Sequence, residues 1–238
     1  MRNEEQPGRV LMTRWFTRRI HFLLQRGDWT ALEEELQCNW PVPLLLNFLA
    51  HGRSEVREMA AISLMLTGDS TAIPSLVERL GDPEAKVAQA ADHALWAIWC
   101  RHSSGAGQGY LKCGAYHLKH GNFCAAIEKF TLAIAADPEF PEAYNQRSIA
   151  YYLAERYVDS IHDCLQVLER LPVHFGAMAG MGHCYVHLGD LTAARDCYRH
   201  ALRIHPRLDD VAAALAQIDQ ILQRRRGCDT SSPAPQAA

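Results

Sequence analysis

Apolar residues recur at helical spacing along most of the chain. Between residues 9 and 26 they return every three or four positions, at Val10, Leu11, Trp15, Phe16, Ile20, Leu23 and Leu24. This spacing places them on one side of a helix, so we predict a helix over residues 9–26. Gly27 and Asp28 interrupt the pattern, and the Glu-rich segment 29–37 predicts a partner helix.

The C-terminal half has a longer period. Prolines lie 34 residues apart, at Pro138, Pro172 and Pro206. Measured from them, three blocks align without a gap, 107–140, 141–174 and 175–208. The blocks share small residues at their eighth and twentieth places, Gly114, Ser148 and Gly182, then Ala126, Ser160 and Ala194. They share larger residues at three other places. These are Tyr110, Tyr144 and Met178 at the fourth place, His117, Tyr151 and Tyr185 at the eleventh, and Phe130, Cys164 and Tyr198 at the twenty-fourth.

This pattern resembles the tetratricopeptide repeat (TPR), a helix-turn-helix unit. The small places let the two helices of a unit approach closely, and the proline ends each unit. Gly121 and Gly189 supply the turn between paired helices, where glycine is free to adopt a positive φ. The middle block has Glu155 instead, so we expect a less favourable turn there.

A second, shorter repeat of 31 residues occupies 41–101. Segment 42–49 aligns with 73–80, and the apolar places downstream pair as Val56 with Val87, Ala60 with Ala91 and Leu64 with Leu95. With the turn Gly81-Asp82-Pro83-Glu84, this resembles a HEAT-type repeat in its short bacterial form. Two copies are fewer than a repeat array usually needs, so we expect their apolar faces to be buried partly against neighbouring helices.

These patterns predict an all-α solenoid. We expect a disordered N-terminus over 1–8, helices and two HEAT-like repeats over 9–101, and a glycine-rich linker over 102–109. The TPR part then spans 107–224 and ends in a helix from Asp209 that covers the apolar face of the last repeat and presents a polar side to water. Residues 225–238 are expected to be a disordered tail. The stripe of that helix is Val211, Leu215, Ile218 and Leu222.

Composition narrows the function classes. A net charge of −3 gives no positive electrostatic field that would attract a nucleic acid. No apolar run reaches the length of a membrane span. The N-terminus lacks the features of a secretory signal, and the eight cysteines include no CxxC pair. Five of them fall in helical patterns as small buried residues: Cys113, Cys124, Cys164, Cys184 and Cys197. We therefore expect a cytoplasmic protein with reduced thiols.

The predicted helix over 9–26 is basic, with Arg14, Arg18, Arg19 and Arg26. Basic amphipathic helices can lie on anionic membranes. The favoured interpretation is a first solenoid helix with its apolar side inward, and a membrane is not expected as a partner.

Residues with catalytic or metal-binding chemistry are sparse. The chain has no GxGxxG, GxxxxGK[ST], GxSxG or HExxH motif. His183 and His187 lie four residues apart, and His117 and His120 three apart, but a structural zinc site needs four ligands. We predict no metal, no cofactor and no catalysis. The alternative is an enzyme subunit or a small-molecule or metal-binding accessory protein, because short HEAT-type repeats also resemble those of bilin lyases.

The TPR resemblance implies a concave groove lined by the first helix of each unit. Carried onto this chain, the candidate groove residues are Leu111, Ala115, Leu118, Lys119, Asn145, Ile149, Tyr152, His183, Val186 and His187. This mainly apolar set suits an amphipathic peptide. Leu111 and Ala115 stand where chaperone-tail receptors of this family need Lys and Asn, so we argue against that subclass. The groove can instead be filled by the chain's own ends or by a second copy in a homo-oligomer.

Overall fold

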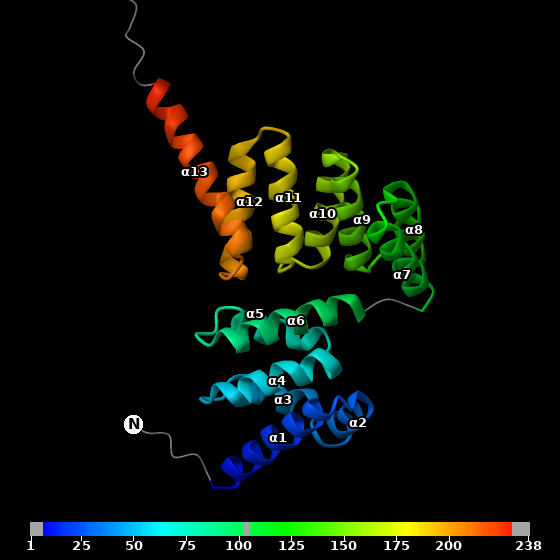
Figure 1. Ribbon diagram of the computed structural model, residues 1–238, viewed down its shortest axis with the longest axis vertical. Coiled ribbons are helices and arrows are strands. Elements are labelled where there is room, and N and C mark those ends of the chain that lie inside the picture. The colour runs from blue at the N-terminus through cyan, green and yellow to red at the C-terminus, as the bar shows by residue number, and fades with distance from the viewer. Residues whose placement is uncertain (1–6, 102–104, 230–238) are drawn as a thin grey trace, which may run out of the picture. The chain divides into compact units, whose positions relative to one another are not determined.

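The computed structural model describes residues 7–101 and 105–229, and every regular element in these ranges is a helix (Figure 1). The chain divides into two compact units, residues 1–102 and residues 103–238. The all-α solenoid prediction is confirmed. None of the helices among the described residues combines the length and the apolar character needed to cross a bilayer.

Unit 1 consists of short helices stacked in succession. They are α1 (Pro7–Arg26), α2 (Trp29–Asn39), α3 (Val42–Leu49), α4 (Ser54–Thr67), η1 (Ser70–Ala72), α5 (Ile73–Arg79) and α6 (Ala85–Arg101). The aligned apolar places of the 31-residue repeat are all fully buried: Val56, Ala60, Leu64, Val87, Ala91 and Leu95. The repeat therefore builds the core of this unit, as its pattern predicts.

A buried ion pair ties the two copies of that repeat together. Asp82, in the predicted turn, accepts hydrogen bonds of 2.8 Å from both Nε and Nη2 of Arg57 on α4. It also accepts from the backbone N–H of Glu84, close to the start of α6. Burial by itself raises the pKa of Asp82, but these hydrogen bonds and the charge of Arg57 outweigh burial and lower it.

Unit 2 consists of three helix pairs and a closing helix. They are α7 (Gly105–Lys119) with α8 (Phe123–Ala136), α9 (Pro141–Leu153) with α10 (Tyr157–Arg170), α11 (Phe175–His187) with α12 (Leu191–Ile204), and then α13 (Asp209–Asp229). Figure 1 shows the pairs standing side by side in chain order. Each pair corresponds to one 34-residue block.

Some predicted boundaries differ from the structure. Helix α1 begins at Pro7, α7 begins at Gly105, and α13 continues to Asp229, so the predictions of irregular chain at 7–8, 105–109 and 225–229 were wrong. Residues 105–109 contain three glycines, whose weak helix propensity misled the prediction. The remaining parts of those predictions, at 1–6, 102–104 and 230–238, lie outside the described residues.

The eighth and twenty-fourth places of each block meet inside the helix pair. A Cβ added to Gly114 would lie 2.5 Å from the ring of Phe130, and one added to Gly182 would strike the ring of Tyr198. In the middle block the ring is replaced by Cys164, and the eighth place is then Ser148, whose hydroxyl donates to the backbone carbonyl of Asn145 at 2.7 Å. Glycine therefore accompanies an aromatic ring at this contact, and serine accompanies cysteine.

The turns between paired helices follow the predicted chemistry. Gly121 and Gly189 have φ of 75° and 79°. Glu155, at the corresponding place of the middle block, has φ of 58°, a conformation in which a side chain is strained. The less favourable turn expected there is present.

Two predictions about buried faces need correction. On α1, Phe16, Ile20 and Leu23 are buried, but Leu11 and Trp15 are exposed. The apolar residues of this helix occupy both sides, so a single inward stripe was the wrong interpretation. Among the cysteines expected to be buried, Cys124 is exposed at the start of α8.

Candidate peptide-binding surface

The ten candidate groove residues come from the first helices of the three pairs. We call α7, α9 and α11 together the first-helix surface. Of the α7 residues, Ala115 and Lys119 are exposed. Leu111 and Leu118 are half-buried and pack against the core formed by Ala126, Phe130 and Ala150. They therefore stabilise the helix pair as well as bordering the surface.

Asn145 lies in the interior instead. Its Nδ2 donates to both carboxylate oxygens of Glu142, at 3.1 and 3.2 Å, and both residues are at most 3% exposed. Gln146 donates to the same carboxylate at 2.6 Å, and Nε2 of the fully buried His174 lies 3.5 Å from it. Asn145 thus satisfies a buried carboxylate, because Glu142 lies one helical turn earlier. This placement does not support a direct contact between Asn145 and a ligand.

Apolar side chains remain exposed on the facing helices α9 and α11. Ile149 is 38% exposed, Leu153 45% and Val186 39%. Leu153 follows Tyr152 at the end of α9, and Val186 precedes His187 at the end of α11. These side chains are free to contact another chain.

Aromatic and histidine rings gather next to them. The Tyr152 hydroxyl lies 3.0 Å from Nε2 of His187, and the His187 ring stacks on Tyr157 with centroids 4.6 Å apart and planes 8° apart. The Tyr198 hydroxyl lies 2.7 Å from Nδ1 of His183. Tyr157 was not predicted for this surface, because it belongs to the second helix of its pair and only the fold brings it to His187.

Burial controls the ionisation of two groups in this cluster. It lowers the pKa of His183, and the neighbouring His187 lowers it further, while Asp210 acts in the opposite direction. Burial also raises the pKa of Tyr198 to about 12, so its hydroxyl stays protonated and available as a donor to His183.

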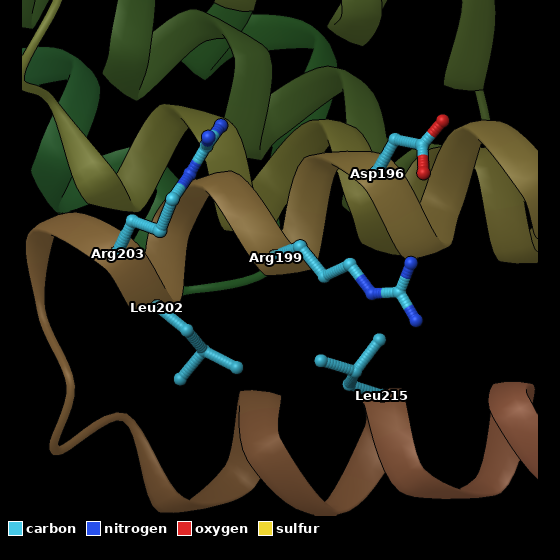
Figure 2. A pocket seen from close by; sticks show the side chains of 5 residues that line it. All are labelled: Asp196, Arg199, Leu202, Arg203 and Leu215. Carbon is cyan, nitrogen blue, oxygen red and sulfur yellow. The ribbon is translucent and has the colours of Figure 1, made fainter.

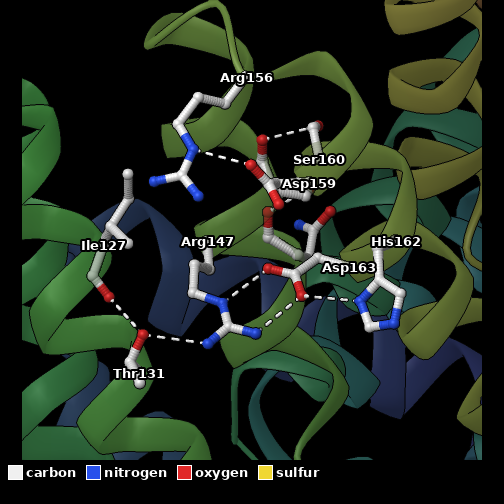
Figure 3. A network of polar contacts seen from close by, with 10 residues as sticks. Ile127, Thr131, Arg147, Arg156, Asp159, Ser160, His162 and Asp163 are labelled. Carbon is white, nitrogen blue, oxygen red and sulfur yellow. Dashed lines mark hydrogen bonds and ion pairs between the residues drawn. The ribbon is translucent and has the colours of Figure 1, made fainter.

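An arginine network fixes the helices beneath this surface (Figure 3). Arg147 on α9 binds Asp163 on α10 through two hydrogen bonds of 2.7 and 2.8 Å and also donates to Thr131 on α8 at 3.0 Å. Its guanidinium lies over the rings of Tyr144 and Tyr151, at 5.9 and 5.7 Å. Burial lowers the pKa of Arg147, but the bonds and charge of Asp163 outweigh burial and raise it. The network therefore holds three consecutive helices in register.

A pocket of about 530 Å³ lies elsewhere in unit 2, between α12 and α13 (Figure 2). Its lining residues are Asp196, Arg199, Leu202, Arg203 and Leu215. Arg199 lies 3.2 Å from both carboxylate oxygens of Asp219 on α13. The pocket contains none of the candidate groove residues. In the part of the chain that the structure describes, no group of three or more His, Cys, Asp or Glu side chains is arranged to hold a metal ion.

Comparison with known protein families gives two matches. The model for HEAT repeats matches residues 30–96, and the model for the tetratricopeptide repeat matches residues 114–172. The chain contains HEAT repeats followed by tetratricopeptide repeats. The TPR match runs from within α7 to just past the end of α10, and α11 with α12 forms a further pair of the same kind.

Individual similar proteins cover parts of the chain. A TPR repeat-containing protein of Rhizobium etli is 30% identical over 82 residues, which are 34% of this chain and 40% of that protein. Intraflagellar transport protein 70A of Danio rerio is 32% identical over 62 residues, 26% of this chain and 10% of that protein. The chain thus spans less than half the length of these relatives.

Among solved structures, the Sgt2 TPR domain from Aspergillus fumigatus is 17% identical with a TM-score of 0.50, covering 57% of this chain and 91% of that one. This likeness concerns the fold. The first TPR of Spaghetti (RPAP3), solved with the HSP90 peptide SRMEEVD, is 22% identical with a TM-score of 0.49, covering 52% of this chain and 98% of that one.

Proposed function

We propose that the protein is a non-catalytic interaction module whose first-helix surface binds a peptide or helix with apolar anchors. The observation that carries this proposal is the exposure of Ile149 and Leu153 on α9 and of Val186 on the neighbouring first helix α11. Exposed apolar side chains on a rigid helical scaffold suit the spaced anchors of an amphipathic helix.

The surrounding groups refine the chemistry of the partner. Tyr152 and His187 adjoin Leu153 and Val186 in the chain and carry a hydroxyl and ring nitrogens that can accept or donate hydrogen bonds. Leu111 and Ala115 carry no charge, so this end of the surface offers no cation from those places to a terminal carboxylate. The partner is therefore expected to bind through internal apolar residues and not through a chaperone-type C-terminus.

The proposal can be tested by selecting binders from a library of amphipathic helical peptides. Selected peptides are expected to lose at least about tenfold in affinity when Ile149, Leu153 and Val186 are all replaced by Glu, since each buried apolar side chain contributes on the order of 1 kcal/mol or more. The peptide SRMEEVD is expected not to bind.

A matched control uses exposed apolar residues on the second helix of the middle pair. Val158 and Leu165, on α10, are 69% and 49% exposed, and their replacement by Glu should leave binding unchanged. Selected peptides that bind the triple variant as tightly as the wild type would refute the assignment of the surface. Strong binding of SRMEEVD would refute the exclusion of the chaperone-tail class.

A further inference from the structure

The outer side of α1 presents three large apolar side chains. Leu11 is 67% exposed, Trp15 52% and Phe22 47%. At about 100° per residue they lie within an arc of about 40°. Ile20, which is fully buried, lies about 180° from Leu11. The helix is therefore anchored in unit 1 by one side and displays an apolar ridge on the other.

Basic side chains flank this ridge. Residues 7–26 contain five arginines and no acidic residue, in a chain whose net charge is −3. Arg14 and Arg26 lie on opposite sides of the ridge, and no ion pair among the described residues involves either of them. The guanidinium of Arg26 lies 5.4 Å from the centre of the Phe22 ring. Arg19, by contrast, is paired with Glu35 at 2.8 Å.

The expectation that a membrane is not a partner rested on an inward apolar side, which these exposed side chains contradict. We propose that this outer face of α1 docks on an anionic lipid bilayer. Interfacial helices lie flat on a bilayer, with aromatic and aliphatic side chains at the boundary between headgroups and acyl chains and arginines among the lipid phosphates. The ridge supplies the first kind of contact, and Arg14 and Arg26 supply the second on both flanks.

The position of the arginines favours a bilayer over a protein groove as the occupant. A protein groove that enclosed the ridge would place apolar walls against the two arginines on its flanks. When the ridge enters a membrane, the arginines instead lie at the depth of the lipid phosphates. The helix is also already folded and fixed through Phe16, Ile20 and Leu23, so docking requires no ordering of the backbone. The proposal concerns unit 1 and is independent of the first-helix surface.

The test is co-sedimentation of the full chain with phosphatidylcholine vesicles that contain or lack phosphatidylserine. The wild type is expected to bind the phosphatidylserine vesicles, to release in high salt, and not to bind phosphatidylcholine alone. A basic residue near an anionic surface adds about a fivefold increase in partitioning, so Arg14→Gln with Arg26→Gln should reduce binding by about 25-fold. Trp15→Ser with Phe22→Ser should abolish it.

Matched controls change the same residue types elsewhere. Arg224→Gln with Arg225→Gln, both exposed on α13, and Val158→Ser with Leu165→Ser, on α10, should bind vesicles like the wild type. Trp15 also contacts the ring of buried Trp40, with centroids 5.1 Å apart. Leu11→Ser with Phe22→Ser leaves that contact intact and should likewise abolish vesicle binding, with an unfolding curve like that of the wild type. Failure of the wild type to bind phosphatidylserine vesicles, or equal binding by the α1 variants, would overturn the proposal. Capture of an acidic amphipathic peptide without vesicle binding would assign the face to a protein and also overturn it.

Discussion

The contact between Gly114 and Phe130 gives a direct test of how the helix pairs pack. A Cβ at Gly114 would lie 2.5, 2.6 and 2.9 Å from three ring carbons of Phe130. Carbon atoms prefer separations of about 3.5–4.0 Å. Phe130 is fully buried, so its ring cannot swing into solvent to make room. Gly114→Ala must therefore strain the pair α7 and α8.

The size of the effect is a balance of two terms. Overpacking a core costs about 1–3 kcal/mol, whereas alanine in place of glycine gains about 0.5–1 kcal/mol in a helix interior. We expect a net loss of about 1–2 kcal/mol. Gly180→Ala on α11 is the matched control, because its Cβ would meet only the Cys164 sulfur at 3.7 Å. Gly180→Ala should gain the higher helix propensity of alanine without a clash, and should therefore be more stable than the wild type.

The chain carries its own probes for this measurement. All five tryptophans lie before residue 102 and all eight tyrosines after it. In urea unfolding, the tyrosine bands of the second-derivative absorbance spectrum, which separates them from tryptophan, therefore follow unit 2, and tryptophan fluorescence follows unit 1. Gly114→Ala should lower the tyrosine midpoint and leave the tryptophan midpoint unchanged.

A double-mutant cycle then isolates the contact. Gly114→Ser combined with Phe130→Cys reproduces the pair Ser148 and Cys164 of the middle block. The double variant should be more stable than the sum of the single changes predicts, by at least about 1 kcal/mol, because the smaller side chain removes the clash. The reasoning would be wrong if Gly114→Ala matched or exceeded the wild type in stability, or if the cycle were additive.

Three further predictions concern unit 2, each followed by tyrosine absorbance. Glu155→Gly should stabilise the unit by about 1 kcal/mol by relieving the positive φ, and a loss of stability would show that the side chain has another role. Arg147→Met should destabilise it by roughly 3–5 kcal/mol because Asp163, 2% exposed, loses its guanidinium partner. Adding Asp163→Leu should restore most of the loss, and no restoration would exclude the uncompensated charge as the cause. Because the pKa of His183 is lowered on folding, the unfolded chain binds its proton more readily, so stability should fall as the pH drops below about 6.5, and His183→Gln should reduce that slope. An unchanged slope would contradict the assignment.

The sequence alone determined the repeat architecture. The periods of 31 and 34 residues set the helix pairs, and the eighth, twentieth and twenty-fourth places of the longer repeat became buried contacts of the structure. The turn residues were also readable, since a positive φ favours glycine and Glu155 stood out against Gly121 and Gly189. These features depend on local backbone preference and on contacts within one repeat, which a pattern in the chain records directly.

Only the tertiary structure decided which of the candidate groove residues are free. Leu118 was predicted as a groove residue and is half-buried against a core cluster. Asn145 was also predicted there, but it is buried and hydrogen-bonded to Glu142. Tyr157 joined His187 across two helix pairs, and α1 displayed Leu11 and Trp15 outward. Helical periodicity places a residue on a side of its helix, but exposure depends on how much of that side the neighbouring helices cover. That coverage is set by helix crossing and side-chain volume between repeats, and the chain sequence does not encode it position by position.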